Sequence, residues 1–478
     1  MPPFFSKACN AQDIFQSLRI AQSEEYDKYR NQFPVIHISF NEFGRRCNSY
    51  EQYIEKNKKR LVKDLKKEYP EAGISEEAGA AETLLELYAE DDTARFIFVL
   101  DEWDFIFHQN FITENDKRDY LSFLRNLLKD KPYVRLAYMT GILPIAKYSS
   151  GSELNMFSEF TMASEERFSE YFGFTEKDVD LLFSRYQGRN EKQKQVTREG
   201  LKEWYDGYHT KAGERLYNPR SVVMSLSNNN LGNYWTSSGP YDELYYYIER
   251  NVDAVRDDLP RMVSGIPVPA KVREYAATSQ ELKTKEEIFS AMVVYGFLSY
   301  ENGKVSIPNK ELGDKFAEML QKEPSLGYVY RLARESERML QATLAGDTKT
   351  MEEVLELVHD TEVPILSYNH ETELAAVVNL IYLAARDTYR VEREDKAGKG
   401  YVDFIFYPET DKSADCLILE LKVDHTPDEA IQQIKEKNYA LRFRGKIGEK
   451  IKYSGRILAV GISYGKAEKK HSCRVEVL

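Results

Sequence analysis

Three short apolar runs separated by helical patterns are the feature that most constrains the fold of this chain. The runs cover residues 34–40 (PVIHISF), 95–101 (RFIFVLD) and 134–141 (VRLAYMTG). Each is too short for a typical buried helix but is typical of a buried strand. Helical patterns over 50–69 and 116–128 lie between them. Strands that alternate with helices predict an open α/β sheet.

Length and composition exclude several classes of protein. The 478 residues exceed one ordinary core, and the 42% of hydrophobic residues exclude a disordered chain. The four cysteines form no Cys-x-x-Cys pair, which argues against a zinc ribbon or a disulfide scaffold and favours a reducing compartment. No apolar run approaches the roughly 20 residues of a membrane helix, and the N-terminus lacks the pattern of a secretory signal. We therefore expect a soluble cytoplasmic protein.

The net charge of −12 conceals a basic block near the C-terminus. Residues 431–474 contain twelve Lys or Arg against three Glu, which gives this block +9 and leaves −21 for the rest. A basic block on an acidic protein is what a local polyanion site needs. The pattern predicts nucleic acid, either DNA or RNA, as a partner of this block. A solvated charged surface explains the same pattern.

The last part of the chain predicts a second α/β unit. An apolar helical pattern covers 371–389, and a second helical pattern covers 427–441. Three apolar runs are typical of strands, at 401–407, 415–423 and 456–463.

The middle of the chain, at about 241–360, is rich in charge and mostly helical in pattern, apart from a predicted hairpin around Asn302-Gly303. These changes of character predict one domain over 1–235, a helical region over 236–365 and another domain over 366–478.

Three charged residues interrupt the strand-like runs of the last domain. Asp403 lies within YVDFIFY, and Glu420 and Lys422 lie two residues apart in CLILELKV, so that both face the same side of a strand. Burying charge is costly unless something compensates it. A divalent cation, Mg²⁺ or Mn²⁺, held by Asp403 and Glu420 would do so. Lys422 would then orient or deprotonate the attacking water and stabilise the developing charge. An ion pair at a sheet edge explains the spacing of Glu420 and Lys422 equally well.

The order of these elements resembles the PD-(D/E)XK nuclease fold. The segment AIQQIKEKNY (430–439) is similar to the Ala-x-x-Gln-Ile-x-x-Lys-x-Tyr helix of the nuclease-like domain fused to AAA-ATPase-like proteins. The segment REDKAGKGYVDFIFYP (393–408) is similar to the Gly-rich lead into that domain's Asp strand, although Tyr401 stands where the family usually has Arg. The resemblance implies metal ligands at Asp403 and Glu420, a catalytic lysine at Lys422, an auxiliary acid at Glu373, and a residue that positions substrate or water at Gln433.

A second set of candidate residues follows two strands of the N-terminal domain. The run FIFVL ends in Asp101 and Glu102, and the next run ends at Thr140. At the carboxyl edge of a parallel sheet, Asp101 would hold Mg²⁺ through water, and Glu102 would activate a water for attack on a γ-phosphate. Thr140 would sense that phosphate. A strand that simply ends in solvent explains the same residues.

Five motifs in order resemble AAA-ATPase-like proteins that end in this nuclease domain. The resemblance covers nearly the whole chain and implies an incomplete P-loop-type (ASCE-like) parallel-sheet domain with ATP as its ligand. Members of this family resemble bacterial proteins of mobile-element or defence type. Arg220 stands where the family usually has Trp. The motifs are VLDEWD, MTGILPIAKYSSGSELN, FGFT, WYDGYH and YNPRSV.

A phosphate-binding loop of the form G-x-x-x-x-G-K-[ST] occurs nowhere in the sequence. In the family it lies upstream of a segment similar to residues 4–20. We therefore expect no ATP hydrolysis by this chain alone, and strands that lack a pairing partner unless another segment or an oligomer supplies it. The sequence predicts a metal-dependent nuclease domain fused to a degenerate ATPase-like module. An ATP-binding regulatory protein and a non-catalytic interaction protein are the alternatives.

Overall fold

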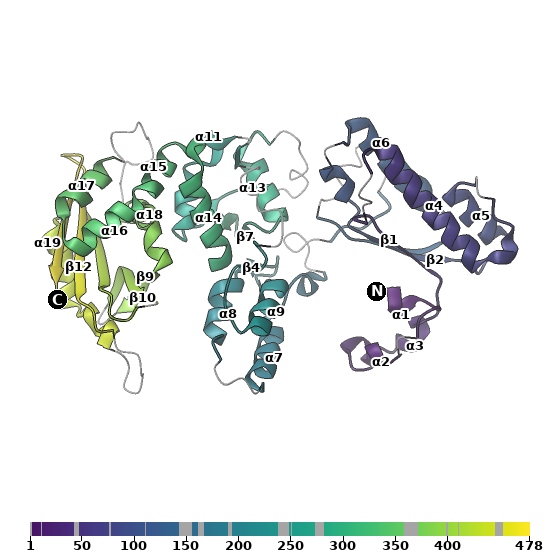
Figure 1. The fold of residues 1–478 in the computed structure, drawn as a ribbon, viewed down its shortest axis with the longest axis horizontal. Helices are drawn as coiled ribbons and strands as arrows, with labels where there is room; N and C mark the ends of the chain where they lie inside the picture. Colours follow the sequence, from purple (N-terminus) through teal and green to yellow (C-terminus); the bar gives the residue numbers. More distant parts are fainter. Residues whose placement is uncertain are drawn as a thin grey trace. The chain divides into compact units, whose positions relative to one another are not determined.

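A computed structural model gives the fold of two compact units (Figure 1). One unit is Met1–Glu159 with Glu274–Thr278, and the other is Phe160–Arg273 with Ser279–Leu478. The domain boundaries inferred from the sequence stay a prediction. The structure describes residues 2–10, 12–42, 47–75, 78–109, 111–142, 155–160, 167–189, 194–237, 248–249, 251–272, 282–357, 371–397, 400–409, 411–444 and 453–478.

The first unit is built on a parallel three-stranded sheet. Its strands are β1 (Val35–Ser39), β2 (Phe96–Asp101) and β3 (Val134–Met139), in the order β1-β2-β3. The first five residues of β2 are buried, as expected for a central apolar strand. All three strands lie within the predicted runs, so the predicted parallel α/β sheet is confirmed.

Three long helices accompany this sheet. Helix α4 (Tyr50–Glu68) begins at the capping residue Ser49, and α6 (Glu114–Leu128) begins with a capping box at Thr113. The hydroxyl of Tyr53 donates to the carbonyl of Phe40 over 2.8 Å, which ties α4 to the end of β1. The remaining helices of this unit are α5 (Ala80–Glu90) and the short α1 (Pro2–Phe5), α2 (Gln12–Phe15) and α3 (Tyr26–Tyr29).

The outer edge of β3 has no strand beside it among the described residues. Leu136 and Tyr138 on this strand are 45% and 42% exposed. The strand that the sequence analysis expects beside it stays a prediction.

Short helices and small sheets form the first part of the second unit. The predicted hairpin is present as β7 (Ser299–Glu301) and β8 (Lys304–Ser306), and Asn302 and Gly303 both have positive φ, as a type I′ turn requires. The other elements are α7 (Glu176–Gln187), α8 (Arg198–Tyr205), β4 (Tyr208–His209), β5 (Arg215–Leu216), α9 (Pro219–Asn228), α11 (Val252–Val255), α12 (Asp258–Val263), β6 (Val268–Pro269), α13 (Lys285–Val294), α14 (Lys310–Lys322), α15 (Tyr328–Arg334), α16 (Ser336–Ala345) and α17 (Thr348–Glu356).

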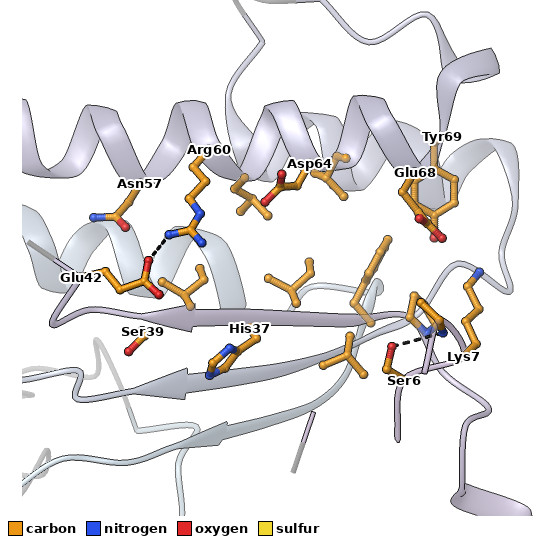
Figure 2. Close-up of a pocket in the computed structure, with 18 residues that line it drawn as sticks. Ser6, Lys7, His37, Ser39, Glu42, Asn57, Arg60, Asp64, Glu68 and Tyr69 are labelled. Atoms are coloured by element: carbon orange, nitrogen blue, oxygen red, sulfur yellow. Dashed lines mark hydrogen bonds and ion pairs between the residues drawn. The ribbon is translucent and has the colours of Figure 1, made fainter. Parts of the chain in front are cut away.

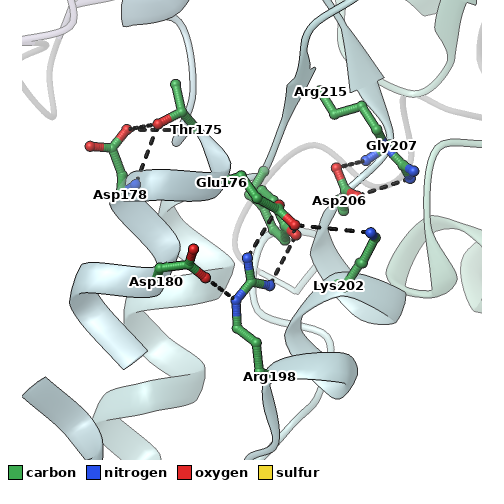
Figure 3. A network of polar contacts seen from close by, with 10 residues as sticks. Thr175, Glu176, Asp178, Asp180, Arg198, Lys202, Asp206, Gly207 and Arg215 are labelled. Atoms are coloured by element: carbon green, nitrogen blue, oxygen red, sulfur yellow. Dashed lines mark hydrogen bonds and ion pairs between the residues drawn. The ribbon is translucent and has the colours of Figure 1, made fainter. Parts of the chain in front are cut away.

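The motif WYDGYH has a structural role at the end of α8 (Figure 3). The buried carboxylate of Asp206 accepts from the backbone N–H of Gly207 over 2.7 Å and pairs with Arg215 over 2.9 Å. Gly207 has a φ of 108°, and a Cβ there would lie 1.9 Å from the carbonyl oxygen of Pro308. The Tyr208 hydroxyl donates to the carbonyl of Gly296 over 2.9 Å. Only glycine fits this close approach, and the motif anchors the α8 segment to the following helices.

Helices α7 and α8 are joined by a polar network in the same view (Figure 3). The guanidinium of Arg198 lies 2.7 Å from Asp180 and 3.2 Å from Glu176. The same guanidinium donates to the hydroxyl of Tyr217 over 3.0 Å. Each charged group named here has an oppositely charged partner, so these residues have a structural role in joining the two helices.

A mixed five-stranded sheet forms the last part of the second unit, in the order β13-β12-β11-β10-β9. Strands β11 and β12 are parallel and the other neighbours are antiparallel. The sequence predicts the three central strands, but not the outer two. The five are β9 (Tyr389–Ala397), β10 (Gly400–Pro408), β11 (Cys416–Val423), β12 (Ile457–Gly465) and β13 (Lys470–Val477).

Helices α19 (Pro427–Glu436) and α18 (Glu371–Ile381) pack on the two faces of this sheet, and α17 contacts its outer strand β13. Helix α19 buries Ile431 and Ile434 against Ile405 and Ile418. On the other face, α18 packs against β11. Both helices end earlier than the sequence indicates. The chain after α18 turns into a short 3-10 helix before β9, and the chain after α19 continues as a 3-10 helix over Tyr439–Arg444.

Among the helices that the structure describes, none combines the length and the apolar character needed to cross a bilayer. The mixed α/β architecture thus has a parallel sheet near the N-terminus, helices in the middle and a mixed sheet near the C-terminus, as predicted.

Candidate active site

Strands β10 and β11 bring the first two predicted site residues together. The antiparallel register pairs Phe404 with Leu419, so Asp403 and Glu420 are the next residues along the two strands. A carboxylate oxygen of Asp403 accepts from the backbone N–H of Leu421 over 2.8 Å. The two carboxylates therefore lie at the point where the strands begin to separate, with Asp403 fixed by β11 itself.

Glu420 is the most deeply buried charged group of this site, with 3% of its surface exposed. Its Oε1 accepts from Nζ of Lys422 over 3.3 Å and from the side-chain amide of Gln433. Its Oε2 is buried without a hydrogen-bond partner. Burial, followed by the charge of Asp403, raises the pKa of Glu420 to about 8. Buried carboxylate oxygens normally have a hydrogen-bond partner or a cation beside them, so this oxygen is a candidate metal ligand.

The pKa of Asp403 is also raised. Burial raises its pKa above the ordinary value, while the Leu421 N–H and the charge of Lys422 act in the opposite direction. A buried and a half-buried carboxyl group thus lie close together, and the positive charges of Lys422 and Arg393 compensate for them only in part.

Lys422 lies between two acids. Its Nζ is 3.3 Å from Glu420 and 3.8 Å from Glu371, the first residue of α18. The predicted auxiliary acid Glu373 lies in the first turn of α18, but its side chain is outside the described residues. The sequence analysis selected Glu373 and not Glu371, although both acids stand at the start of this helix and either could have been chosen.

Gln433 reaches Glu420 because α19 lies unusually close to the sheet. Gly461 of β12 is the register partner of Glu420, and a Cβ there would lie 2.4 Å from the Pro427 carbonyl oxygen. The Gln433 amide also lies 3.5 Å from the hydroxyl of Tyr439. No sequence pattern singled out Gly461, although it permits the helix to approach.

The donor set fits a divalent cation with few protein ligands. No group of three or more His, Cys, Asp or Glu that could hold a metal occurs in the described part of the chain. Mg²⁺ commonly takes one or two carboxylates and completes its octahedron with water and phosphate oxygens. The buried Oε2 of Glu420, which has no hydrogen-bond partner among the described residues, and the neighbouring carboxylate of Asp403 match that requirement.

Much of the basic block is already neutralised by nearby acids. Of its residues with described side chains, four form ion pairs at 2.5–3.2 Å, which are Lys435 with Glu476, Arg456 with Asp415, Lys466 with Asp424, and Arg474 with Glu476. Residues 445–452, which carry three of the twelve cations, lie outside the described residues. His425 is exposed beside Glu429 and belongs to the start of α19.

The three N-terminal candidates also come together, at the carboxyl edge of β2 and β3. The Thr140 hydroxyl donates to the carboxylate of Asp101, and the Glu102 N–H donates to the same hydroxyl over 3.4 Å. Burial, then the charges of Asp101 and Asp104, raises the pKa of Glu102. Glu102 has a φ of 55°, a backbone conformation that a non-glycine residue adopts at a cost of about 1–3 kcal/mol.

A close contact fixes the loops around these residues. A Cβ at Gly141 would lie 2.3 Å from a ring carbon of Trp103 and 2.6 Å from a carboxylate oxygen of Asp104. The same carboxylate accepts from the N–H of Ile142 over 2.9 Å. The glycine of the MTG motif is therefore required by packing against the WD residues of the first motif.

Comparisons with known proteins identify both regions. Residues 1–150 match the model of a predicted AAA-ATPase family, and residues 370–460 match the PD-(D/E)XK nuclease superfamily. No protein with curated annotation matches the chain. A solved structure, the Walker-type ATPase PABY2304 of Pyrococcus abyssi, is 13% identical with a TM-score of 0.34, over 59% of this chain and 84% of that one. The chain therefore carries an AAA-ATPase-like domain and a domain of the PD-(D/E)XK nuclease superfamily.

Proposed function

We propose that the C-terminal domain hydrolyses phosphodiester bonds of nucleic acid with Mg²⁺ or Mn²⁺. The observation that carries this proposal is the buried Glu420 beside Asp403, with one Glu420 oxygen that has no hydrogen-bond partner among the described residues and with Lys422 next to it. Nuclease superfamily membership supports the reaction class. The described cations of the basic block that have no acidic partner, such as Lys437 and Lys470, support nucleic acid as the polyanion.

The roles of four residues in this proposal follow from their contacts. Asp403 and Glu420 would hold the metal, and Gln433 fixes one oxygen of Glu420, which would leave the other oxygen to the metal. Lys422 orients or deprotonates the attacking water and stabilises the negative charge of the transition state. The bound divalent ion supplies a Lewis acid for the phosphate and lowers the pKa of water. Glu373 serves as the auxiliary acid in this proposal.

A second function, ATP binding by the N-terminal domain, is favoured by one observation. Asp101, Glu102 and Thr140 lie together at the carboxyl edge of the sheet, within the segment that matches the AAA-ATPase model. Because the chain contains no phosphate-binding loop, we propose that it does not hydrolyse ATP alone. An ATPase would bind nucleotide tightly, and Glu102→Gln would keep that binding while stopping turnover. The absence of nucleotide binding in both proteins would exclude this function.

The cysteines support a cytoplasmic location in this proposal. The four residues are free thiols, two of them buried, as expected in a reducing compartment such as the cytoplasm.

The test is cleavage of labelled single- and double-stranded DNA and RNA with Mg²⁺, with Mn²⁺ and with chelator. We expect metal-dependent cleavage that Lys422→Ala removes while the protein stays folded. The matched control is Lys437→Ala, a cation of the same domain that lies outside the metal site and is expected to weaken binding only. Absence of cleavage by the folded wild-type protein under every condition would contradict the proposal and favour a non-catalytic interaction protein.

A further inference from the structure

A groove in the first unit lies between β1 and α4 and encloses about 350 Å³ (Figure 2). One wall is formed by six consecutive residues, 34–39, that include the whole of β1. The other wall consists of α4 side chains spaced about one turn apart, among them Asn57, Arg60, Asp64 and Glu68. A groove between an edge strand and a helix has room for one further extended chain.

The open edge of β1 carries free backbone groups. The carbonyl of Pro34 accepts from Ile97 and the N–H of Phe40 donates to Asp101, so the even-numbered residues bond to β2. In a parallel pair the bonding residues alternate. Val35, His37 and Ser39 therefore direct their N–H and C=O groups away from β2. Apart from a turn at Ser39, no backbone bond to them occurs in the described part of the chain.

The N-terminal segment shows that this side of the chain accepts a strand. The N–H of Phe33 donates to Phe5, and the N–H of Lys7 donates to Phe33, both over 2.9 Å, in a parallel bridge. The backbone bonds between this segment and Phe33 end at Lys7, while Ala8 still lines the groove. Among the described residues, no strand pairs with residues 35–39 on this side.

Nothing in β1 protects the edge. Natural proteins discourage strand addition with lysine, proline, bulges or a covering segment. The sequence VIHIS has no charge of that kind and no proline, and its pairing with β2 is regular over all five residues.

The side chains of the groove define the chemistry of what would fit. Asp64 and Glu68, one helical turn apart, form no hydrogen bond or ion pair among the described residues, although Asp64 interacts electrostatically with Arg60. Arg60 is occupied by Glu42 at one end of the groove, and Lys7 lies over the ring of Tyr69 at the other, as Figure 2 shows. The carboxylates of Asp64 and Glu68 lie in the same groove as the apolar side chains of Ile36, Leu61 and Leu65, a combination that matches basic side chains alternating with apolar ones.

We propose that the open edge of β1 binds an extended segment of a partner protein, in which basic and apolar side chains alternate, as a fourth strand of the sheet. Main-chain hydrogen bonds to Val35, His37 and Ser39 supply the affinity. Asp64 and Glu68 supply the preference for basic side chains. This activity is independent of the proposed nuclease, because the groove contains none of its residues.

Binding can be tested with the full-length protein and a short capped peptide of alternating lysine and valine that carries a fluorophore. We expect saturable binding by fluorescence anisotropy, and slower hydrogen exchange of the amides of residues 35–39. The double variant Asp64→Asn/Glu68→Gln should weaken binding about tenfold. The matched control Glu51→Gln/Glu55→Gln removes the same charge from α4 outside the groove and should leave binding unchanged.

Two peptide controls separate strand addition from simple charge attraction. A peptide with N-methylated valines keeps its charge but loses N–H donors, and it should not bind. A peptide with glutamate in place of lysine should bind at least tenfold more weakly.

Equal binding of the N-methylated peptide, or unchanged exchange at residues 35–39, would overturn the proposal. Concentration-dependent self-association that protects the same amides without peptide would assign the edge to a second copy of this chain and also overturn it.

Discussion

The side-chain amide of Gln433 donates a hydrogen bond to Oε1 of Glu420, joining α19 to β11 at the candidate active site. The bond holds one oxygen of a buried carboxylate and leaves the other oxygen without a hydrogen-bond partner. The free oxygen, the neighbouring Asp403 and the adjacent Lys422 together form an arrangement that one divalent ion would complete.

Replacing Glu420 with Gln should stabilise the metal-free protein at alkaline pH. The pKa of this carboxyl rises from an ordinary 4.5 to about 8 on folding, so the folded state holds the proton more tightly than the unfolded chain. The burial cost is absent below about pH 4.5 and grows as the pH rises toward 8. We expect a gain in the free energy of unfolding at pH 8 in chelator, and this gain shrinks as the pH falls. Urea unfolding at several pH values measures it, and equal stability at pH 8 would contradict the pKa shift.

Metal binding should release protons and tighten with pH. Both carboxylates have raised pKa values, and each must lose its proton before it can bind a cation. Calorimetry with Mn²⁺ in two buffers of different ionisation enthalpy should report proton release at pH 6.5 and less at pH 8.5. Asp403→Asn should abolish the binding. Asp411→Asn, a change of the same kind at an exposed aspartate, should leave it intact.

Lys422→Met should remove cleavage while metal binding persists. The ammonium group lies 3.3 Å from Glu420 and is placed to act on water or on the phosphate rather than on the metal. We expect a loss of at least about a hundredfold in kcat with an unchanged or stronger affinity for Mn²⁺, because a competing cation is gone. A parallel loss of metal affinity and activity would instead make Lys422 a structural partner of the carboxylates.

Gly461→Ala should disturb the site from a distance. The new Cβ would lie 2.4 Å from the Pro427 carbonyl, so α19 must move away from the sheet and carry Gln433 with it. We expect a loss of about 1–3 kcal/mol in stability and a reduced kcat. The control Gly313→Ala, in the interior of α14 with nothing closer than 3.9 Å to its Cβ, should be neutral or slightly stabilising. Wild-type stability in G461A would show that the close approach is not required.

The two acids that open α18 can be separated by mutation. Glu373→Gln should reduce kcat about tenfold or more if that residue is the auxiliary acid of the proposal. Glu371→Gln removes only the more distant partner of Lys422, at 3.8 Å, and should have a smaller effect. The pH dependence of kcat for each variant distinguishes them, and a larger loss in Glu371→Gln would transfer the role to that residue.

The elements that could be predicted from the sequence are those with a clear local signal, such as a continuous apolar run or a turn-forming residue pair. Runs such as FIFVLD and CLILELKV become central strands because both faces are covered, and the Asn-Gly pair becomes a hairpin turn. The outer strands β9 and β13 were missed because both carry mixed charge, which is typical of loops, and because β13 alternates buried with exposed residues in its first half.

The site was predictable to the extent that its residues lie on strands. The spacing of Glu420 and Lys422 fixes a common face, and the antiparallel register then brings Asp403 to them. The contact of Lys422 with Glu371 depends on how α18 approaches the sheet, and the contact of Gln433 depends on the absence of a side chain at Gly461. Packing distances of this kind are not encoded in the spacing of any local motif.

The most direct test of the account is cleavage of labelled nucleic acid as Mg²⁺ or Mn²⁺ is titrated, with wild-type protein and Asp403→Asn compared at equal concentration. We expect cleavage that rises with metal in the wild type, stops with chelator and is absent in D403N, although the variant stays folded. Cleavage by D403N at the wild-type rate, or none by the wild type at any metal concentration, would contradict it.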